Sequence, residues 1–372
     1  MKILHVTPTY LPAVRYGGPI VAVHGLCRAL AARGHAVDVF TTNVDGDGAL
    51  DVPVAEPVVL DGVRVHYFPS PFPRLYWSPA MRRGLGASLR GYDIVHIHAV
   101  YLWPGVAAGG AARRHGVPYV ISPRGMLVPG LIAKKSRLLK SLWLRLVERQ
   151  NFAGAAGVHF TSPLEWEEAM KVGLPLPSPF VVPNGIELVP RPFVPREERV
   201  LLFLGRINWK KGLEPVIQLL ASLPNTRLVI AGNDEEELTP RLEELAVRSG
   251  VGDRVEFFGP VHGDAKWELM ARATLFVLNS DSENFGNVVL EALSMETPVV
   301  LSQGVGLAEE VLRAGAGAIG LEQIARLLDS PDVRKRMGRN GRILVESVFS
   351  WPRVALAMED QYSRIVARRR RF

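Results

Sequence analysis

Two carboxylates and the glycine-containing turn between them form the most informative stretch of this sequence. Glu283 lies in a polar loop after an apolar, strand-like run, and Glu291 lies about one turn inside a helix that the periodicity predicts to begin at Asn287. The amides of residues 285–287 would lie at the start of that helix, where unpaired N–H groups and the helix dipole favour an anion. A carboxylate can also accept hydrogen bonds from a sugar diol. The stretch suits a phosphorylated, hydroxyl-rich ligand, although either glutamate alone is more commonly a solvated or capping side chain.

A basic loop bounded by glycines lies upstream of this stretch. Gly205 and Arg206 follow a predicted strand, and Lys211 and Gly212 open a predicted helix. Arginine offers a planar fork of donors and lysine a compact charge, so together they can neutralise a diphosphate leaving group. A solvated basic loop is the alternative. The position at the carboxyl end of a strand favours a phosphate clamp with Arg206 and Lys211 as its contacts.

Three further glycine-containing turns are weaker candidates for ligand binding. Gly17 and Gly18 separate the first predicted strand from its helix, where the backbone can approach a ligand closely. Gly232 and Asn233 end one strand of the second half, and Val261 follows the next. Simple turns explain all three sites as well.

Histidines and one arginine mark the ends of two strands in the first half. His96 and His98 share one face of the strand predicted over Asp93–Ala99, with His98 nearest its carboxyl end. His96 fits a structural role, and His98 is a candidate site residue, although a core histidine is common at such positions. Arg124 follows the strand predicted over Pro118–Ser122 and is a candidate fixed cation facing phosphate or acceptor.

The elements that must position these residues alternate between strand and helix along the whole chain. This alternation predicts two α/β domains with parallel, doubly wound sheets, whose ligands bind outside the carboxyl ends of the strands, in a cleft between the domains. The proline-rich segment Val189–Glu197 reads as the linker. We therefore predict a first domain over residues 1–188 and a second over 189–351. The predicted strands are Lys2–Thr7, Ala36–Thr42, Val63–Phe68, Asp93–Ala99, Pro118–Ser122, Gly157–Thr161 and Phe180–Pro183 in the first half, and Arg199–Leu204, Thr226–Ala231, Val255–Val261 and Thr274–Leu278 in the second. The predicted helices are Pro19–Arg33, Trp103–His115, Lys134–Gln150 and Pro163–Lys171 in the first half, and Leu213–Leu223, Pro240–Ser249, Asp264–Arg272, Asn287–Met295 and Trp351–Arg370 in the second.

Composition narrows the class of protein and of partner. The chain has 372 residues, of which 48% are hydrophobic, and no apolar run long enough to cross a bilayer. The first strand-like run meets Pro8 at once, so we expect no signal peptide and a cytoplasmic location. The single cysteine, Cys27, excludes an internal disulfide and is expected to be buried on a helix. A formal net charge of +7 favours an anionic partner, and no nucleic-acid-binding motif is present.

Basic segments offer one such anionic partner, a membrane surface. The predicted helix over Lys134–Gln150 is basic and carries Trp143 on its apolar face, and Arg368–Arg371 lie near the chain end. Helices of this kind can lie on anionic lipid at the inner face of a cell membrane. An ordinary surface helix with one core face explains the pattern equally well.

The motif Glu283-Asn284-Phe285-Gly286, followed by Glu291-Ala292-Leu293 and Thr297-Pro298-Val299-Val300, resembles that of the retaining, nucleotide-sugar-dependent glycosyltransferases of family 4. The resemblance spans nearly the whole chain and implies the GT-B fold, with an acceptor-side first domain to which the helix 352–372 returns, and a nucleotide-sugar-binding second domain. It implies catalytic roles for Arg206, Lys211 and Glu283. It assigns donor binding to Gly17, Gly18, Gly205, Gly232, Asn233, Val261, Asn284, Phe285, Gly286, Asn287 and Glu291.

Three positions depart from the family pattern. Family members usually have glycine in place of Asn284 and of Glu296, so Glu296 is expected to alter the shape of the donor pocket. Many carry a histidine near the donor sugar where this chain has Arg124, and a histidine role cannot be carried over. Asp45-Gly46-Asp47 mimics the metal motif of the other glycosyltransferase fold, but its turn-rich surroundings predict a polar turn, so no metal cofactor is expected.

These observations predict a retaining, metal-independent glycosyltransferase. Its donor would be a UDP- or GDP-sugar and its acceptor a glycan or a lipid-linked oligosaccharide in the synthesis of cell-surface polysaccharide. Two alternatives stay open: a nucleotide-sugar epimerase of the same fold, and a non-catalytic protein that binds sugar nucleotides or glycans.

Overall fold

The computed structural model describes residues 1–13, 17–130, 142–234 and 236–369. The chain divides into two compact units, which are Met1–Gly185 with Trp351–Phe372, and Ile186–Ser350. We call them unit 1 and unit 2. Their boundaries lie within three residues of the predicted ones at 188 and 351.

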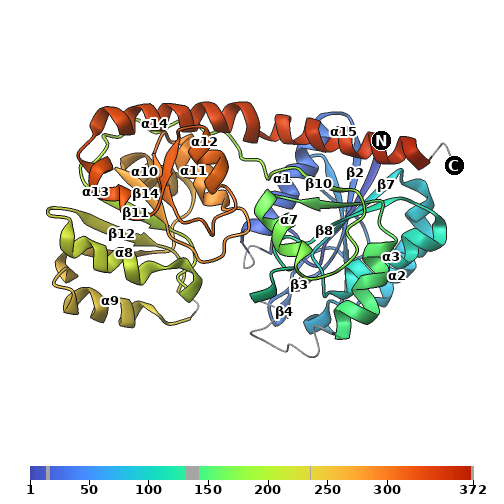
Figure 1. Ribbon diagram of the computed structural model, residues 1–372. Coiled ribbons are helices and arrows are strands. Elements are labelled where there is room, and N and C mark those ends of the chain that lie inside the picture. Colours follow the sequence, from blue (N-terminus) through green and yellow to red (C-terminus); the bar gives the residue numbers. More distant parts are fainter. Residues whose placement is uncertain (14–16, 131–141, 235, 370–372) are drawn as a thin grey trace. The chain divides into compact units, whose positions relative to one another are not determined.

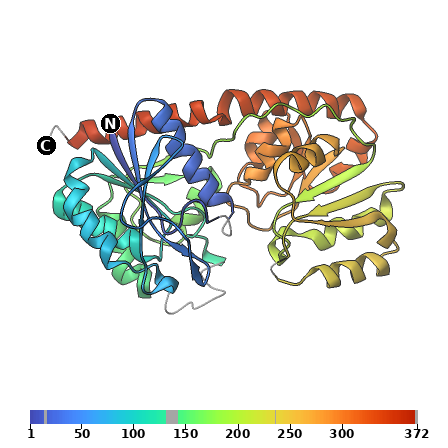
Figure 2. The same ribbon diagram turned by 180° about the vertical axis from the view of Figure 1, so that it is seen from behind.

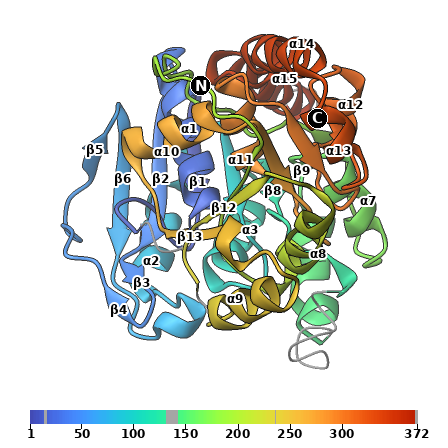
Figure 3. The same ribbon diagram turned by 90° about the vertical axis from the view of Figure 1, so that its left-hand side faces the viewer.

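The sheet of unit 1 has eight strands in the order β10-β9-β8-β7-β1-β2-β6-β5. All neighbouring strands are parallel except β5, which pairs antiparallel with β6 and forms the edge seen in Figure 3. The order reverses between β1 and β7, which places this pair at the switch point of the sheet. The strands are β1 Lys2–Val6, β2 Ala36–Thr42, β5 Val58–Leu60, β6 Val63–Phe68, β7 Ile94–His98, β8 Tyr119–Ser122, β9 Gly157–Phe160 and β10 Pro179–Val181.

Alternating side chains divide the interior of unit 1 into two layers. On β1, Ile3 packs in the layer that contains α1 (Gly18–Ala32) and α15 (Trp351–Arg369). Leu4 and Val6 pack in the opposite layer. The opposite layer also contains α2 (Pro79–Ser88), α3 (Trp103–His115) and α6 (Arg149–Ala153). The α7 helix (Pro163–Met170) begins with Ser162 as its N-cap. Because successive side chains of a strand point to opposite faces of the sheet, every second residue of these buried strands faces α15.

The C-terminal helix α15 completes the core of unit 1 and lies beside α1 in Figure 2, where the two are red and blue. Trp351 is 8% exposed and lies against two glycines. A Cβ atom at Gly25 would lie 2.1 Å from the indole, and one at Gly185 2.4 Å from it. Both positions therefore require the absence of a side chain.

The sheet of unit 2 is entirely parallel and has the order β13-β12-β11-β14-β15-β16. The first strand, β11, lies in the middle of the sheet. The next two strands, β12 and β13, extend the sheet to one side, and β14, β15 and β16 extend it to the other, so the direction of winding reverses between β11 and β14. Ligands of such sheets bind outside the carboxyl ends of the strands at this reversal. The strands are β11 Val200–Leu204, β12 Arg227–Ala231, β13 Val255–Gly259, β14 Leu275–Leu278, β15 Val299–Leu301 and β16 Gly317–Ile319.

Helices cover both faces of this second sheet (Figure 1), as the doubly wound pattern predicts. Glycine or a polar residue begins several of them; for example, Gly286 has a φ of 92° immediately before α11. The helices are α8 Leu213–Leu219, α9 Thr239–Arg248, α10 Gly263–Arg272, α11 Asn287–Ser294, α12 Ala308–Arg313, α13 Gln323–Leu328 and α14 Pro331–Leu344.

Several elements differ from the sequence-based expectation. The strands β5 and β16 and the helices α2, α12, α13 and α14 were not predicted. The β5 strand is a three-residue edge strand, and α2 carries glycines that weaken its periodicity. Asp45-Gly46-Asp47 lies in the hairpin between β3 (Val44–Asp45) and β4 (Gly48–Ala49), so the predicted polar turn is confirmed. Cys27 is buried on α1 as expected. Residues 134–141 of the basic helix predicted over Lys134–Gln150 lie outside the described residues, and Leu144–Glu148 form a π-helical turn.

Candidate active site

Two loops join at the reversal point of the unit 2 sheet. One follows β11 and contains Arg206 and Lys211; the other follows β14 and contains Glu283. The amide of Asp281 donates to the carbonyl of Lys210 at 2.8 Å. Gly212 has a φ of 58°, and a Cβ there would lie 2.1 Å from the carbonyl oxygen of Asn279. The loops therefore pack backbone to backbone, which fixes the side chains that they carry.

The ammonium of Lys211 forms an ion pair with the Glu283 carboxylate across these loops. Both side chains are largely buried, with exposed fractions of 15% and 24%. Arg206 lies exposed in the same loop as Lys211. The structure thus brings together two of the three residues for which the resemblance implied catalytic roles, and it places the third beside them in the chain.

The loop after β14 leads directly into α11, which carries Glu291. Gly286 lies immediately before the helix, so the amides of Gly286 and Asn287 are at its amino end, at the carboxyl edge of the sheet. Glu291 pairs with Lys266 of α10 at 2.9 Å, and the Lys266 ammonium lies 4.1 Å from the centre of the Trp267 ring. The helix start can therefore receive an anion, while Glu291 lies beside a cation that the sequence analysis missed.

The structure is consistent with the expected main-chain role of Phe285 and corrects the expectation for Glu296. The Phe285 side chain is 3% exposed and packs edge-on against Phe349, so only its main chain can contact a ligand. Glu296 lies past the carboxyl end of α11, where its carbonyl accepts a hydrogen bond from Arg196 at 3.0 Å. Because α11 runs away from the carboxyl edge of the sheet, Glu296 is at the opposite end from Gly286 and does not shape a pocket there.

A glycine ends β13 of unit 2 or immediately follows its neighbours β11 and β12. Gly232 donates to the carbonyl of Gly259 at 2.8 Å, and a Cβ at Gly232 would lie 1.8 Å from the carbonyl oxygen of Gly205. Asn233 follows and is exposed, and Val261 lies two residues beyond β13. The absence of a side chain at Gly232 therefore lets the turns after β11 and β12 pack backbone to backbone beside Arg206.

The loop after β15 is part of the same arrangement, although the sequence analysis did not select it. The amide of Glu283 donates to the carbonyl of Gly304 at 2.8 Å, and the amide of Gly306 donates to the carbonyl of Glu283 at 2.9 Å. A Cβ at Gly304 would lie 2.5 Å from main-chain oxygens of the neighbouring loop. The spacing Gly304-Val305-Gly306 shortly after the apolar run Val299–Leu301 was the available signal.

The candidate residues of unit 1 lie at the carboxyl ends of its strands. Gly17 has a φ of 66° and precedes α1, and Gly18 is the first residue of that helix. His98 ends β7 and Arg124 follows β8. Ala99, Tyr101 and Arg124 have φ values of 69°, 66° and 55°. Non-glycine residues in this conformation store strain, which concentrates at functional sites.

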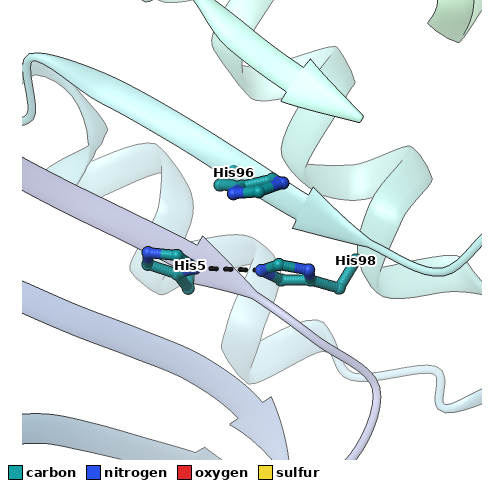
Figure 4. A group of neighbouring side chains, drawn as sticks. All are labelled: His5, His96 and His98. Carbon is teal, nitrogen blue, oxygen red and sulfur yellow. Dashed lines mark hydrogen bonds between the residues drawn. The ribbon is translucent and has the colours of Figure 1, made fainter. Parts of the chain in front are cut away.

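Four buried imidazoles lie behind Arg124, on the face of the sheet that α15 covers. Figure 4 shows His5 on β1 beside His96 and His98 on β7, with Nδ1 of His5 2.9 Å from Nε2 of His98. Nδ1 of His96 lies 2.6 Å from the Tyr362 hydroxyl of α15. His159 on β9 contacts the Val182 carbonyl at 2.8 Å. His5 and His159 were missed, although each alternates with apolar residues in its strand.

Burial keeps this cluster neutral. Burial first, and the Arg124 charge second, lowers the pKa of His5 to about 3 and that of His159 to about 3. The pKa values of His96 and His98 also lie well below the usual range, mainly because of burial.

Nitrogens of His5, His96 and His98 lie within 4.8 Å of one another, as in a metal site. This group contains no carboxylate, and Nη2 of Arg124 lies 3.4 Å from Nδ1 of His98. A metal ion there would add charge beside a fixed cation in a buried space, so the cluster does not fit a metal ion.

Comparison with known proteins identifies the family. The model described as "Glycosyl transferases group 1" matches residues 187–343, and the "Glycosyl transferase 4-like domain" matches residues 17–185. A D-inositol 3-phosphate glycosyltransferase of Xylanimonas cellulosilytica is 30% identical, over 99% of this chain and 97% of its own. The chain belongs to the group 1 glycosyltransferases. A glycogen synthase of Mycobacterium tuberculosis is also 30% identical, over 97% of this chain and 94% of its own.

Solved structures of similar proteins give this glycosyltransferase the GT-B fold. Sucrose-phosphate synthase from Thermosynechococcus elongatus has a TM-score of 0.74 at 22% identity, covering 98% of this chain and 99% of its own. Anabaena HepE, solved in complex with UDP-glucose, has a TM-score of 0.73 at 18% identity, covering 98% of this chain and 100% of its own. The predicted α/β architecture of two Rossmann-like domains is thereby confirmed, and so is the prediction of a transferase.

Proposed function

We propose that this glycosyltransferase transfers a sugar from UDP- or GDP-sugar to a hydroxyl of a glycan or lipid-linked acceptor, with retention at the anomeric carbon. The observation that carries the proposal is the Lys211–Glu283 ion pair at the reversal point of the unit 2 sheet. A cation and a carboxylate held together there match the two ends of a sugar diphosphate. HepE, a relative in fold, was solved with UDP-glucose.

Each residue of the unit 2 site receives a role from its chemistry. Lys211 and Arg206 neutralise the diphosphate, with the amides of Gly286 and Asn287 at the start of α11. Glu283 binds hydroxyls of the transferred sugar, and Glu291 binds the ribose. The glycine-lined edge at Gly232, with Asn233 and Val261, accommodates the nucleobase.

Transfer in this proposal depends on departure of the nucleoside diphosphate. Neutralising its negative charge lowers the barrier to breaking the anomeric C–O bond. The leaving phosphate oxygen takes the proton of the acceptor hydroxyl from the same face, so no separate general base is required. The proposal includes no metal ion; we expect activity to survive saturating chelator, and loss of activity restored by Mg²⁺ or Mn²⁺ would contradict this.

Synthesis of cell-surface polysaccharide at the inner face of the membrane is the proposed setting. No helix of the described residues has the length and apolar character needed to span a bilayer. An exposed loop after β6 presents Phe72, Leu75 and Trp77, which are 51%, 42% and 42% exposed. Residues 62–92 contain five arginines and no acidic residue. Apolar and aromatic side chains beside arginines suit the surface of anionic lipid.

A liposome assay tests the membrane part of this proposal. Sedimentation with anionic vesicles at low salt is the expected result, and it should weaken in a variant with Phe72→Ser and Trp77→Ser. Binding that is absent, or that is unchanged in this variant, would remove membrane contact by this loop from the proposal.

A thermal-shift screen of UDP- and GDP-sugars tests the donor. We expect one donor to raise the unfolding midpoint of the native chain. The same donor should raise the midpoint of Lys211→Ala much less. Release of nucleoside diphosphate that requires an acceptor supports a transferase, whereas interconversion of the sugar without acceptor indicates the epimerase alternative. Stabilisation by a donor without turnover across an acceptor panel would indicate a binding protein.

A further inference from the structure

Arg124 is a half-buried cation that makes no ion pair with a carboxylate of the described residues. Its Nη1 donates to Oδ1 of Asn184 at 2.6 Å, its Nη2 lies 3.4 Å from Nδ1 of His98, and its buried Nε has no partner. Arg64 in the same unit shows the usual arrangement, with Nε and Nη2 at 2.6 and 2.7 Å from the Asp38 carboxylate. Arg64 therefore has a carboxylate as its hydrogen-bond partner, whereas the partners of Arg124 are a neutral amide and an imidazole.

The imidazole cluster orients Arg124 without neutralising it. Arg124 donates to Nδ1 of His98, which leaves the His98 Nε2–H to donate to Nδ1 of His5. This chain of donors runs in one direction and requires both rings to be neutral. The guanidinium therefore donates its hydrogen bonds to neutral acceptors.

Glu165 lies behind the turn, and its charge partly offsets the lowering of the Arg124 pKa by burial, but its hydrogen bonds go to other groups. Glu165 is 3% exposed, and its oxygens accept from the amide of Gly125 at 2.6 Å and from the amide and hydroxyl of Thr161 at 2.7 and 2.8 Å. It fixes the turn in which Arg124 has its positive φ of 55°. The structure thus positions the charge rigidly, with the Glu165 carboxylate nearby but in no ion pair with it.

We infer that Arg124 binds an anionic group of the acceptor, a phosphate or a carboxylate. A half-buried charge that forms no ion pair with a described carboxylate is unfavourable, and a bound oxyanion would receive bidentate hydrogen bonds from the planar guanidinium. The residue lies at the carboxyl edge of the sheet, where α/β domains bind ligands. The assignment to the acceptor rests on the proposed function, with the donor bound in unit 2.

Binding of small sugars to the UDP-saturated protein tests this inference. UDP occupies the diphosphate site of unit 2, and the dissociation constants of glucose 6-phosphate, glucuronate and glucose are then measured by ligand-observed NMR. We expect at least one anionic sugar to bind about tenfold or more tightly than glucose, as one charge-assisted contact predicts. Tighter binding of glucose 6-phosphate would indicate a phosphate as the bound group, and tighter binding of glucuronate would indicate a carboxylate.

Variants decide whether Arg124 is responsible. Arg124→Gln and Arg124→Met should reduce the preference for the anionic sugar to about one, whereas Arg83→Gln, an exposed control on α2, should retain it. Removing a cation without counter-ion should leave the unfolding midpoint unchanged or higher. A preference that is absent in the native chain or persists in both variants, or a fall of the midpoint by more than about 5 °C, would overturn the inference. UDP binding is measured in every variant, so failure of the donor site is recognised separately.

Discussion

The two units hold their functional cations in opposite ways. In unit 2, Lys211 is paired with Glu283 and Lys266 with Glu291, so both lysines already have a carboxylate partner. In unit 1, Arg124 contacts a neutral amide and a neutral imidazole. Both arrangements lie at the carboxyl edge of a parallel sheet, beside the strand pair where the order reverses.

The two arrangements differ in the charge interactions that a ligand must replace or add when it binds. In unit 2 the ion pairs hold the loops in place before the donor binds, and the donor exchanges one set of charge interactions for another. Such an exchange costs little reorganisation and keeps the site pre-formed. In unit 1 an anion would add the interaction that Arg124 lacks. The contrast can be tested by altering each arrangement separately.

Replacing Lys211 should have the largest effect. In Lys211→Ala the diphosphate loses a cation that stabilises its departure, so turnover should fall by about 10²–10³-fold. Steady-state kinetics with the donor found in the screen measures this. Lys335→Ala, an exposed lysine on α14, is the matched control. A rate within a few-fold of the native chain would remove Lys211 from the reaction.

Acid should destabilise unit 1 before unit 2. Four histidines of unit 1 have pKa values far below their unfolded value, so below about pH 6.5 the unfolded chain binds more protons than the folded one. Stability is therefore lost as the pH falls, by up to about 1.4 kcal/mol per pH unit for each histidine. The sequence of unit 2 contains only His262, which is exposed.

Hydrogen exchange resolved by peptide between pH 7 and pH 5 measures this difference. Protection should fall in β1, β7 and β9 while the strands of unit 2 keep theirs, and His159→Gln should reduce the slope. Equal loss in both units would show that the buried imidazoles do not control acid stability.

Glu291→Gln should have the smallest effect. Loss of one charged hydrogen-bond acceptor for the ribose should weaken donor binding by about tenfold, with turnover at saturating donor little changed. Calorimetric titration with UDP measures the affinity, and Glu309→Gln on α12, an exposed glutamate, is the control. An unchanged dissociation constant would show that Glu291 does not bind the ribose.

Many regular elements could be predicted from the sequence, but the 14-residue helix α14, several short elements and the tertiary contacts were not. The helix predicted over Trp103–His115 has those bounds in the structure, because its glycine C-cap and apolar face are local signals. The edge strand β5 is too short to show a period. Lys211 and Glu283 were each predicted from a local motif, but their contact depends on the strand order that places β14 beside β11.

The cluster behind Arg124 shows the same limit. His96 and His98 were recognised as sharing a face because they lie in one strand. His5 and His159 join them only through the pairing of β1, β7, β8 and β9, which a single sequence does not reveal. Glu296 was misplaced because nearness in sequence to Gly286 was taken for nearness in space, although α11 separates the two.

A crystal structure of the protein with UDP tests the central claim most directly. The account predicts that the diphosphate lies against the Lys211 ammonium, the Arg206 guanidinium and the amide of Gly286, with the ribose at Glu291. UDP bound away from the carboxyl ends of β11 and β14, with the Lys211–Glu283 pair undisturbed and no contact from Arg206, would contradict it.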